Sequence, residues 1–336
     1  MSNQPNPVEI TMQLATGYMA SASMNAVTRL KIADLLAQGP KSVAELAAAT
    51  SVNEDILYRV LRALASAGVF VESAPRIFAN TPSSEVLRTD VPGSMWPMIL
   101  WMCDPLHFDV YRDMMPTLKD GKPGIEHVFK KPAFDIIFSN EEVAQVFNNA
   151  MTTFSAMVIP AVLETYDFGD TGTLADIAGG HGFVLTAILK KYPQMKGILF
   201  DLDHVVVGAR QRIDEMNLAD RVELVSGDFF QSVPAADSYV MKHIIHDWDD
   251  EKALTILKNC AKHLKPGGKV ILNEAVLSPG NEPNLGKWID IEMFMMPGGR
   301  ERTEEEFRDL FAKAGLQLTR IVPNKSPLWV VEAQKV

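Results

Sequence analysis

The 336-residue sequence has little cysteine, with only Cys103 and Cys260. Two cysteines so far apart cannot form the disulfide framework of a small secreted domain, and they lack the close spacing of a zinc-binding pair. We therefore expect a protein of a reducing compartment, the cytoplasm, without a cysteine metal centre.

Basic residues are also scarce: 32 lysines and arginines stand against 42 aspartates and glutamates, a formal net charge of -10. An acidic protein repels nucleic-acid phosphates and anionic lipid headgroups. Long apolar runs are lacking too, since the most apolar stretch, 95–103, is too short to span a bilayer. The first ten residues do not resemble a secretory signal. We expect a soluble protein that binds neither nucleic acid nor membrane.

The sequence opens with helical patterns. Apolar residues recur at helical spacing over 8–36. Ser42 and Glu45 have the spacing of a capping box before a short Ala-rich helix, and Asn53 precedes an amphipathic pattern over 54–67. Two short apolar segments with a Pro-containing turn between them predict a hairpin, with strands at 69–72 and 76–79. The order helix, helix, hairpin predicts a winged helix-turn-helix.

Winged helices often bind DNA, but between 41 and 90 five basic residues are outnumbered by six acidic ones. The helix at 54–67 also begins with Glu54 and Asp55, at the end that would approach the bases. Binding through counterion release needs a basic surface, so we expect this domain to serve dimerisation instead. A regulatory ligand-binding module built on the winged helix remains an alternative from another functional class.

Beyond residue 90 the apolar pattern changes. Residues 91–166 are predicted to be largely helical, and from 167 short apolar runs alternate with amphipathic helices, which is typical of a Rossmann-like, doubly wound α/β sheet. Strands are expected at 174–178, 197–201, 221–225, 238–242 and 269–275, with an antiparallel hairpin at 316–322 and 328–333 on one edge. The predicted domains are a dimerisation domain at 1–105, a substrate-lining helical segment at 106–166 and a catalytic domain at 167–336.

The first predicted strand leads into a glycine-rich turn that contains Gly179 and Gly180. These glycines let the backbone approach a ligand at the carboxyl edge of the sheet, and the turn lacks the lysine and hydroxyl residues of a phosphate-binding loop. Asp176, just before the turn, would repel a pyrophosphate. The turn therefore suits a cationic ligand.

Further acids follow the next two strands. Asp201 and Leu202 end the second strand, where a carboxylate can accept hydrogen bonds from two ribose hydroxyls. Gly227, Asp228 and Phe229 follow the third, where an acid and a ring can bind an adenine. Each acid alone could be a helix cap or a turn former. Together they indicate an adenosine with a positive charge, which is S-adenosyl-L-methionine.

The fourth strand leads into His246-Asp-Trp-Asp-Asp-Glu251. This segment resembles a motif of the S-adenosylmethionine-dependent O-methyltransferases that include plant caffeate and flavonoid enzymes, acetylserotonin methyltransferase and bacterial tailoring enzymes. The resemblance covers nearly the whole chain, with similar segments in the same order at 146–151, 227–229, 264–268 and 297–303. It implies methyl transfer to a hydroxyl of a small molecule, with S-adenosyl-L-homocysteine as the second product.

The resemblance also implies residue roles. His246 would be the general base, with Glu274 and Glu301 flanking and orienting it, and Asp247 is an alternative orienting group. The expected cofactor contacts are Gly179, Gly180, Asp201, Leu202, Gly227, Asp228, Phe229 and Lys242. One position departs from the family pattern, since Ala178 replaces the first glycine of a Gly-Gly-Gly turn. A methyl group fits there if the φ angle of Ala178 is negative.

A metal bound by His243, His246 and Asp247 is the competing interpretation. At the end of a strand, residues three apart have side chains on opposite faces, so we expect the two rings to diverge. We therefore expect His243 to be a packed side chain and no metal to bind.

The acceptor pocket is expected between the helical segment and the catalytic domain. Its expected lining is Phe147, Met151, Phe154, Met293 and Met296, which offers few polar groups. We therefore expect a flat, aromatic, weakly polar acceptor, and the resemblance implies that it carries a phenolic hydroxyl. The apolar helices at 8–36 and 95–103 offer more hydrophobic surface than a small winged helix can cover, which predicts a homodimer. An N-methyltransferase, or a relative that no longer methylates, remains an alternative on the same fold.

Overall fold

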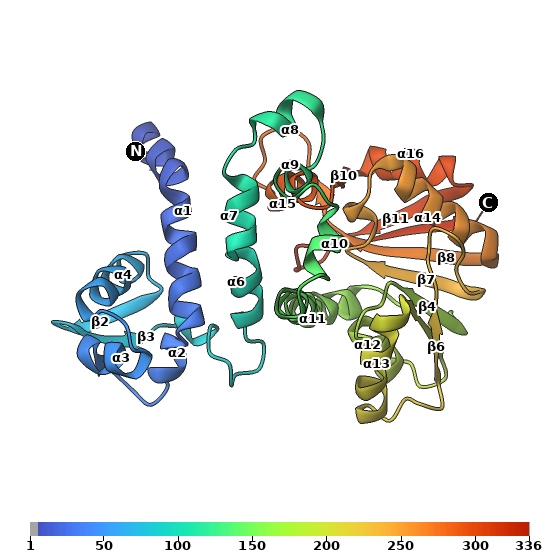
Figure 1. The fold of residues 1–336 in the computed structure, drawn as a ribbon. Coiled ribbons are helices and arrows are strands. Elements are labelled where there is room, and N and C mark those ends of the chain that lie inside the picture. The colour runs from blue at the N-terminus through green and yellow to red at the C-terminus, as the bar shows by residue number, and fades with distance from the viewer. Residues whose placement is uncertain (1–5, 336) are drawn as a thin grey trace, which may run out of the picture. The chain divides into compact units, whose positions relative to one another are not determined.

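A computed structural model describes residues 6–335, which form two compact units (Figure 1). The first unit comprises the chain up to Asp109 together with Gln145–Thr153, and the second comprises Val110–Ala144 together with the chain from Phe154 onward. The segment 106–166, expected to be separate, is divided between the two units. It is divided because its long last helix, α11 (Glu141–Thr165), supplies residues to both.

The first unit combines helices with a small antiparallel sheet. The predicted helix, helix and hairpin are present, and a short strand that precedes the helices completes a sheet of order β1-β3-β2. The strands are β1 (Lys41–Ser42), β2 (Phe70–Ala74) and β3 (Ile77–Asn80). The helices are α1 (Pro7–Arg29), α2 (Ile32–Leu35), α3 (Val43–Thr50), α4 (Glu54–Ser66), α5 (Pro82–Glu85), α6 (Trp96–Met102) and α7 (Pro105–Tyr111), whose end belongs to the second unit.

The predicted helix caps are confirmed. The Ser42 hydroxyl accepts the backbone N–H of Glu45 at 3.2 Å, and the Glu45 carboxylate accepts the N–H of Ser42 at 2.8 Å, which is a capping box. The Asn53 side chain accepts the N–H of Ile56 at 3.1 Å at the start of α4. These bonds satisfy N–H groups that a helix start leaves unpaired.

Helix α1 exposes apolar side chains along its first half. Their exposed fractions range from 43% for Ile10 to 67% for Val8, and the set is Val8, Ile10, Met12, Leu14, Tyr18 and Met19. Further along the helix, Val27 is buried in the core of the first unit. The first half of α1 therefore presents an apolar surface that its own unit does not cover.

Helix α11 is the one described helix that is long and apolar enough, by length and composition, to cross a membrane. The sequence reading placed no such segment here. In the structure Val158, Ile159 and Val162 of this helix are buried in a core cluster of the second unit. Core helices of soluble proteins satisfy the same length and composition test, so the helix does not indicate a membrane partner.

The second unit is built on a seven-stranded sheet of order β11-β12-β8-β7-β4-β5-β6. Strands β4 to β8 are parallel, and β12 runs antiparallel to both of its neighbours, as predicted for a terminal hairpin. The strands are β4 (Thr173–Ile177), β5 (Lys196–Asp201), β6 (Val222–Ser226), β7 (Ala236–Lys242), β8 (Leu264–Glu274), β11 (Leu316–Val322) and β12 (Trp329–Lys335). Strand β8 begins five residues before its predicted start, because Leu264 pairs with Ala236 of β7.

Helices cover both faces of this sheet (Figure 1). One face packs against α12 (Phe183–Lys191), α13 (Asp203–Glu215) and the end of α11, and the other against α14 (Asp250–His263) and α16 (Glu304–Lys313). The remaining elements are α8 (Met115–Asp120), α9 (Gly124–Phe129), α10 (Ala133–Ile137), α15 (Gly286–Met295), a 3₁₀ turn at Ile245–Asp247, and the strand pair β9 (Val276–Leu277) and β10 (Arg302–Thr303).

The strand order reverses at β4. The chain proceeds from β4 outward through β5 to β6, then returns to β7 on the other side of β4. In doubly wound sheets a crevice opens at the carboxyl ends of the strands at such a point, and ligands bind there. The predicted polar residues of β4, β5, β6 and β7 all lie at these ends.

Candidate active site

The turn after β4 contains one residue in an unexpected conformation. Ala178 has a φ of 56°, in the left-handed region, so the negative angle that would accommodate its methyl group is not adopted. Gly180 also adopts a φ of 56°. A Cβ in this region clashes with the following carbonyl, at a cost of about 1–2 kcal/mol, which explains why glycine suits the position and marks Ala178 as strained.

Asp176 supports this turn from inside the sheet. Its side chain is 1% exposed and accepts the backbone N–H of Leu185 at 3.2 Å. Burial, with the nearby Asp201 carboxylate, raises the pKa of Asp176 to about 7. A Cβ at Gly179 would lie 2.9 Å from the Asp176 carboxyl, so only glycine fits above it.

Asp201, at the end of β5, holds the other side of the turn. Its two carboxylate oxygens accept the backbone N–H groups of Gly180 at 2.8 Å and of Leu202 at 2.7 Å. Burial raises the pKa of Asp201. A carboxylate oxygen has two lone pairs, so each oxygen keeps one for a further donor such as a ribose hydroxyl. The side chain of Leu202 is 46% exposed.

The residues after β6 form a tight turn. Asp228 accepts the N–H of Phe230 at 2.8 Å, which is the turn-forming role that the sequence left open beside ligand binding. Phe229 is half-buried. Its ring is edge-on to the rings of Phe230 and Trp248, with ring centres 4.7 Å and 5.9 Å away. At Gly227 a Cβ would lie 2.7 Å from the Phe200 ring, so a side chain is excluded.

Lys242 ends β7, which lies between β8 and β4 in the sheet. Its ammonium lies 5.5 Å from the centre of the Phe154 ring. Burial lowers the pKa of Lys242, against the attraction of the carboxylates of Glu274, Asp247 and Asp176.

His246 lies in the 3₁₀ turn that follows β7 and is 6% exposed. Its Nδ1 is 2.7 Å from a carboxylate oxygen of Glu301, whose side chain is fully buried. Burial raises the pKa of Glu301 to about 8, and the nearby Asp290 adds to that effect. The Nε2 of His246 lies 3.4 Å from Asp247, an ion-pair separation without a hydrogen bond. Glu301 is therefore the acid that bonds this imidazole, and Nε2 is the ring nitrogen left without a hydrogen bond.

Glu274 flanks the His246 turn, as expected, but contacts its backbone and not its ring. Its carboxylate accepts the backbone N–H groups of Ile244 at 3.1 Å and Ile245 at 2.9 Å, and it makes no hydrogen bond to His246. Burial raises the pKa of Glu274 to about 7. Glu274 thus fixes the backbone that leads into the His246 turn, whereas the ring itself is held by Glu301.

The expected divergence of the His243 and His246 rings is wrong. His243 and His246 do not point apart: their rings stack at 4.1 Å with an angle of 28°, and with Glu301 they form a cluster of potential ligands within 4.8 Å. They meet because His243 leaves the strand with a φ of 53° and the next residues form the 3₁₀ turn. The structure therefore brings potential metal ligands together, and the absence of a metal stays a prediction.

The five expected acceptor-lining residues fall in both units. Phe154 belongs to the second unit and stacks on His243 at 4.8 Å. Met293 and Met296 also belong to it, with Met293 half-buried and Met296 3% exposed. Phe147 and Met151 belong to the first unit, where the Phe147 ring is edge-on to Trp101 at 5.0 Å.

Two residues of the site were missed by the sequence reading. Arg302 is 1% exposed, and its guanidinium bonds the backbone on both sides of His246, at Ile245 and Trp248. Gly299 packs directly on the same turn. Both lie within 297–303, the segment that resembles the family, but their roles depend on the tertiary fold.

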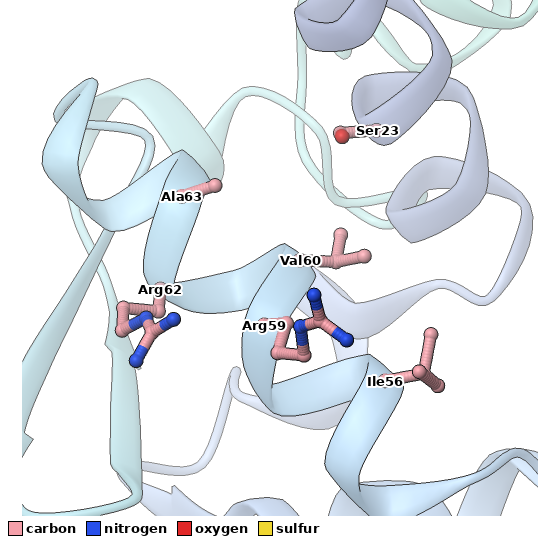
Figure 2. A pocket seen from close by; sticks show the side chains of 6 residues that line it. All are labelled: Ser23, Ile56, Arg59, Val60, Arg62 and Ala63. Atoms are coloured by element: carbon pink, nitrogen blue, oxygen red, sulfur yellow. The ribbon is translucent and has the colours of Figure 1, made fainter.

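A hollow of about 400 Å³ lies elsewhere, within the first unit (Figure 2). It is lined by Ser23 of α1 and by Ile56, Arg59, Val60, Arg62 and Ala63 of α4. None of the expected cofactor or catalytic residues lines it, so this hollow is not the site described above.

Known proteins similar to this chain share both of its parts. The family model of the O-methyltransferase domain matches residues 111–317, and that of the O-methyltransferase dimerisation domain matches 12–90. The phenazine O-methyltransferase PhzM of Lysobacter antibioticus is 40% identical, over 97% of this chain and 96% of that protein. The 8-amino-8-demethylriboflavin N,N-dimethyltransferase of Streptomyces davaonensis is 32% identical, over 91% and 89%.

Solved structures show the same fold. The crystal structure of LaPhzM aligns with a TM-score of 0.93 at 39% identity, over 99% of this chain and all of that one. The structure of CalO1, a methyltransferase of calicheamicin biosynthesis with SAH bound, aligns with a TM-score of 0.87 at 33% identity, over 99% of this chain and all of that one.

Proposed function

Because the chain belongs to the O-methyltransferase family, with a dimerisation domain ahead of a methyltransferase domain, we propose that it methylates a phenolic hydroxyl of a small aromatic molecule, with His246 as general base. The cofactor of this reaction is S-adenosyl-L-methionine, and no metal is required. The observation that supports the proposal is the 2.7 Å bond between His246 and Glu301 at the carboxyl edge of the sheet, beside the glycine turn.

The residues at the strand ends fit that cofactor. Asp201 keeps one lone pair on each carboxylate oxygen for the ribose hydroxyls, and Gly179 lets the backbone approach the ligand. We propose that Leu202 and Phe229 flank the adenine and that Asp228 binds its amino group. The remaining proposed contacts are Gly180, Gly227 and Lys242. When bound, the cofactor supplies a sulfonium whose methyl carbon is electrophilic.

The protein's task is then to position an oxygen and remove its proton. A phenol with a pKa near 10 is a poor nucleophile at neutral pH. With Nδ1 of His246 donating to the Glu301 carboxylate, Nε2 has a free lone pair and can take the phenol proton as the new bond forms, worth about 10²–10⁴ in rate. Glu301 then stabilises the imidazolium, as an acid does in a catalytic triad.

The acceptor is proposed to be flat and aromatic. We propose Phe154 and Met293, which are half-buried, as its apolar contacts, with Met296, Phe147 and Met151 as further contacts. A hydroxylated phenazine is the first candidate, because a 40% identical relative is named a phenazine O-methyltransferase. An amine acceptor is the second candidate, because the relative named an N,N-dimethyltransferase is 32% identical. We further propose that the enzyme is a cytoplasmic homodimer.

The test is incubation with cofactor labelled at its methyl group and a panel of phenols, hydroxyphenazines and aromatic amines. We expect a mass gain of one methyl group on a hydroxylated acceptor, located at oxygen by NMR. Transfer to amines alone would replace the O-methyltransferase proposal with the second candidate, and transfer to no member of the panel would contradict both.

A further inference from the structure

Arg302 is the largest fully buried side chain of the described residues, and the mechanism above does not use it. It lies in the short strand β10, directly after Glu301. A buried charge is costly unless it is paired and fully hydrogen-bonded. The hydrogen-bond partners of Arg302 therefore indicate what this side chain contributes to the site.

All five N–H groups of the guanidinium have partners. Nε donates to the Asp250 carboxylate at 3.1 Å, and Nη2 donates to the same oxygen at 2.8 Å and to the Trp248 carbonyl at 3.0 Å. Nη1 donates to the carbonyls of Ile245 at 3.1 Å and Arg300 at 3.3 Å. The carbonyls of Ile245 and Trp248 bracket His246, so this one side chain holds both ends of the catalytic turn.

The backbone before Arg302 is fastened to the same turn. The N–H of Arg300 donates to the His246 carbonyl at 2.8 Å. A Cβ at Gly299 would overlap that carbonyl oxygen and the backbone of Asp247, and would lie 2.6 Å from the Trp248 nitrogen. Only a glycine allows the two backbone segments to approach so closely.

We propose that Arg302 and Gly299 are positioning residues, which dock the segment that contains Glu301 against the turn that contains His246. The inference rests on the proposed function and extends it to these two residues. The contact between these two segments keeps the Glu301 carboxylate 2.7 Å from Nδ1 of His246 and thereby fixes the direction of Nε2. A shift of about 1 Å between the two segments breaks this alignment, and misplacements of that size can cost about 10²-fold in rate.

The first test is Arg302→Lys, because a lysine keeps the charge but cannot supply five donors in a planar fork. We expect turnover of a phenol with a pKa near 10 to fall by about 10- to 100-fold. A nitrophenol, already ionised at neutral pH, should be methylated within threefold of the wild-type rate. Cofactor affinity, measured by calorimetry, should also stay within threefold. The matched control is Arg308→Lys in α16, an exposed arginine paired with Glu304, which should change neither rate.

Gly299→Ala is a second variant that forces the segments apart without altering any charge, and it should show the same preference for the acidic phenol. A merely structural role would reduce turnover of both phenols equally, and that result would overturn the proposal. Turnover of the high-pKa phenol within threefold of wild type in both variants would overturn it as well.

A readout without turnover separates this inference from the proposed function. The Nδ1 proton of His246 shared with Glu301 should give a far-downfield resonance in the proton NMR spectrum, absent in His246→Ala. We expect Arg302→Lys and Gly299→Ala to shift or broaden it, even if the wild-type protein methylates no phenol. An unchanged resonance in both variants would contradict the positioning role.

Discussion

Ala178 and His243 share an uncommon backbone conformation at neighbouring positions in the sheet. They follow the adjacent strands β4 and β7 with φ angles of 56° and 53°. Left-handed residues other than glycine are uncommon, and they tend to occur where a site needs a sharp change of chain direction. Here one turn shapes the proposed cofactor loop, and the other brings the His243 ring onto the ring of His246, the proposed general base.

The strain at Ala178 leads to a stability prediction. Ala178→Gly removes a Cβ that is unfavourable at this φ, although glycine adds entropy to the unfolded chain, so we expect a net gain of about 0.5–1 kcal/mol in the free energy of unfolding. Chemical denaturation should show the gain. Ala48→Gly, at an exposed position within α3, is the control and should cost about 1 kcal/mol. A loss of stability in Ala178→Gly would show that the turn is not strained.

His246 is predicted to act on the proton rather than on the cofactor. His246→Ala should leave cofactor affinity nearly intact and slow methylation of a phenol with a pKa near 10 by about 10²–10⁴. The defect should shrink for a nitrophenol, which needs no base. The control is His243→Phe, which keeps an uncharged ring against Phe154 and His246 and should show no dependence on acceptor acidity. A His246→Ala enzyme within threefold of wild type on the high-pKa phenol would contradict the mechanism.

At the scale of elements, the contact between Glu301 in the segment before β10 and His246 in the turn after β7 leads us to expect that turnover depends on pH. Burial raises the pKa of Glu301 to about 8, so at lower pH its carboxyl tends to be protonated and no longer offers the charged acceptor that stabilises the imidazolium. Turnover of the high-pKa phenol should therefore rise between about pH 7 and 9, as the Glu301 carboxyl loses its proton, and fall again at lower pH.

The variant Glu301→Gln tests whether Glu301 causes this rise of turnover with pH. Glutamine keeps a carbonyl oxygen near Nδ1 but does not titrate, so the rise near pH 8 should disappear while a slower basal rate remains. Rates measured from pH 6 to 9 in both proteins decide the point. An unchanged dependence of rate on pH in Glu301→Gln would assign the rise to another group, such as Asp247. Burial raises the pKa of Asp247 to about 7.

The sequence predicted the elements well because their signals are local. The capping residues Ser42 and Asn53 and the apolar runs of the parallel strands depend only on neighbours in the chain, and the structure confirms them. Contacts set by the tertiary fold were not accessible in this way. Glu274 binds backbone amides after β7 because strand register places Asn273 opposite Lys242, and the alternation rule failed at His243 because the strand had already ended.

At the scale of the molecule, the apolar surface of α1 is the feature that the single chain leaves unexplained. Six large apolar side chains in its first half are between 43% and 67% exposed. Contiguous exposed apolar surface of this kind commonly marks an interface. The family model of a dimerisation domain covers residues 12–90, which include most of this surface, so a second copy of the chain is the proposed partner.

The dimer is tested by light scattering at micromolar concentration, where we expect twice the 37.1 kDa mass of one chain. Leu14→Glu places a charge on a side chain that is 64% exposed in the single chain but would be buried in the dimer, and it should shift the mass toward the monomer. The matched control is Val207→Glu on α13, an apolar side chain 72% exposed in the second unit, which should leave the dimer intact. A wild-type protein of 37.1 kDa would contradict the dimer, and a dimeric Leu14→Glu would move the interface away from the first half of α1.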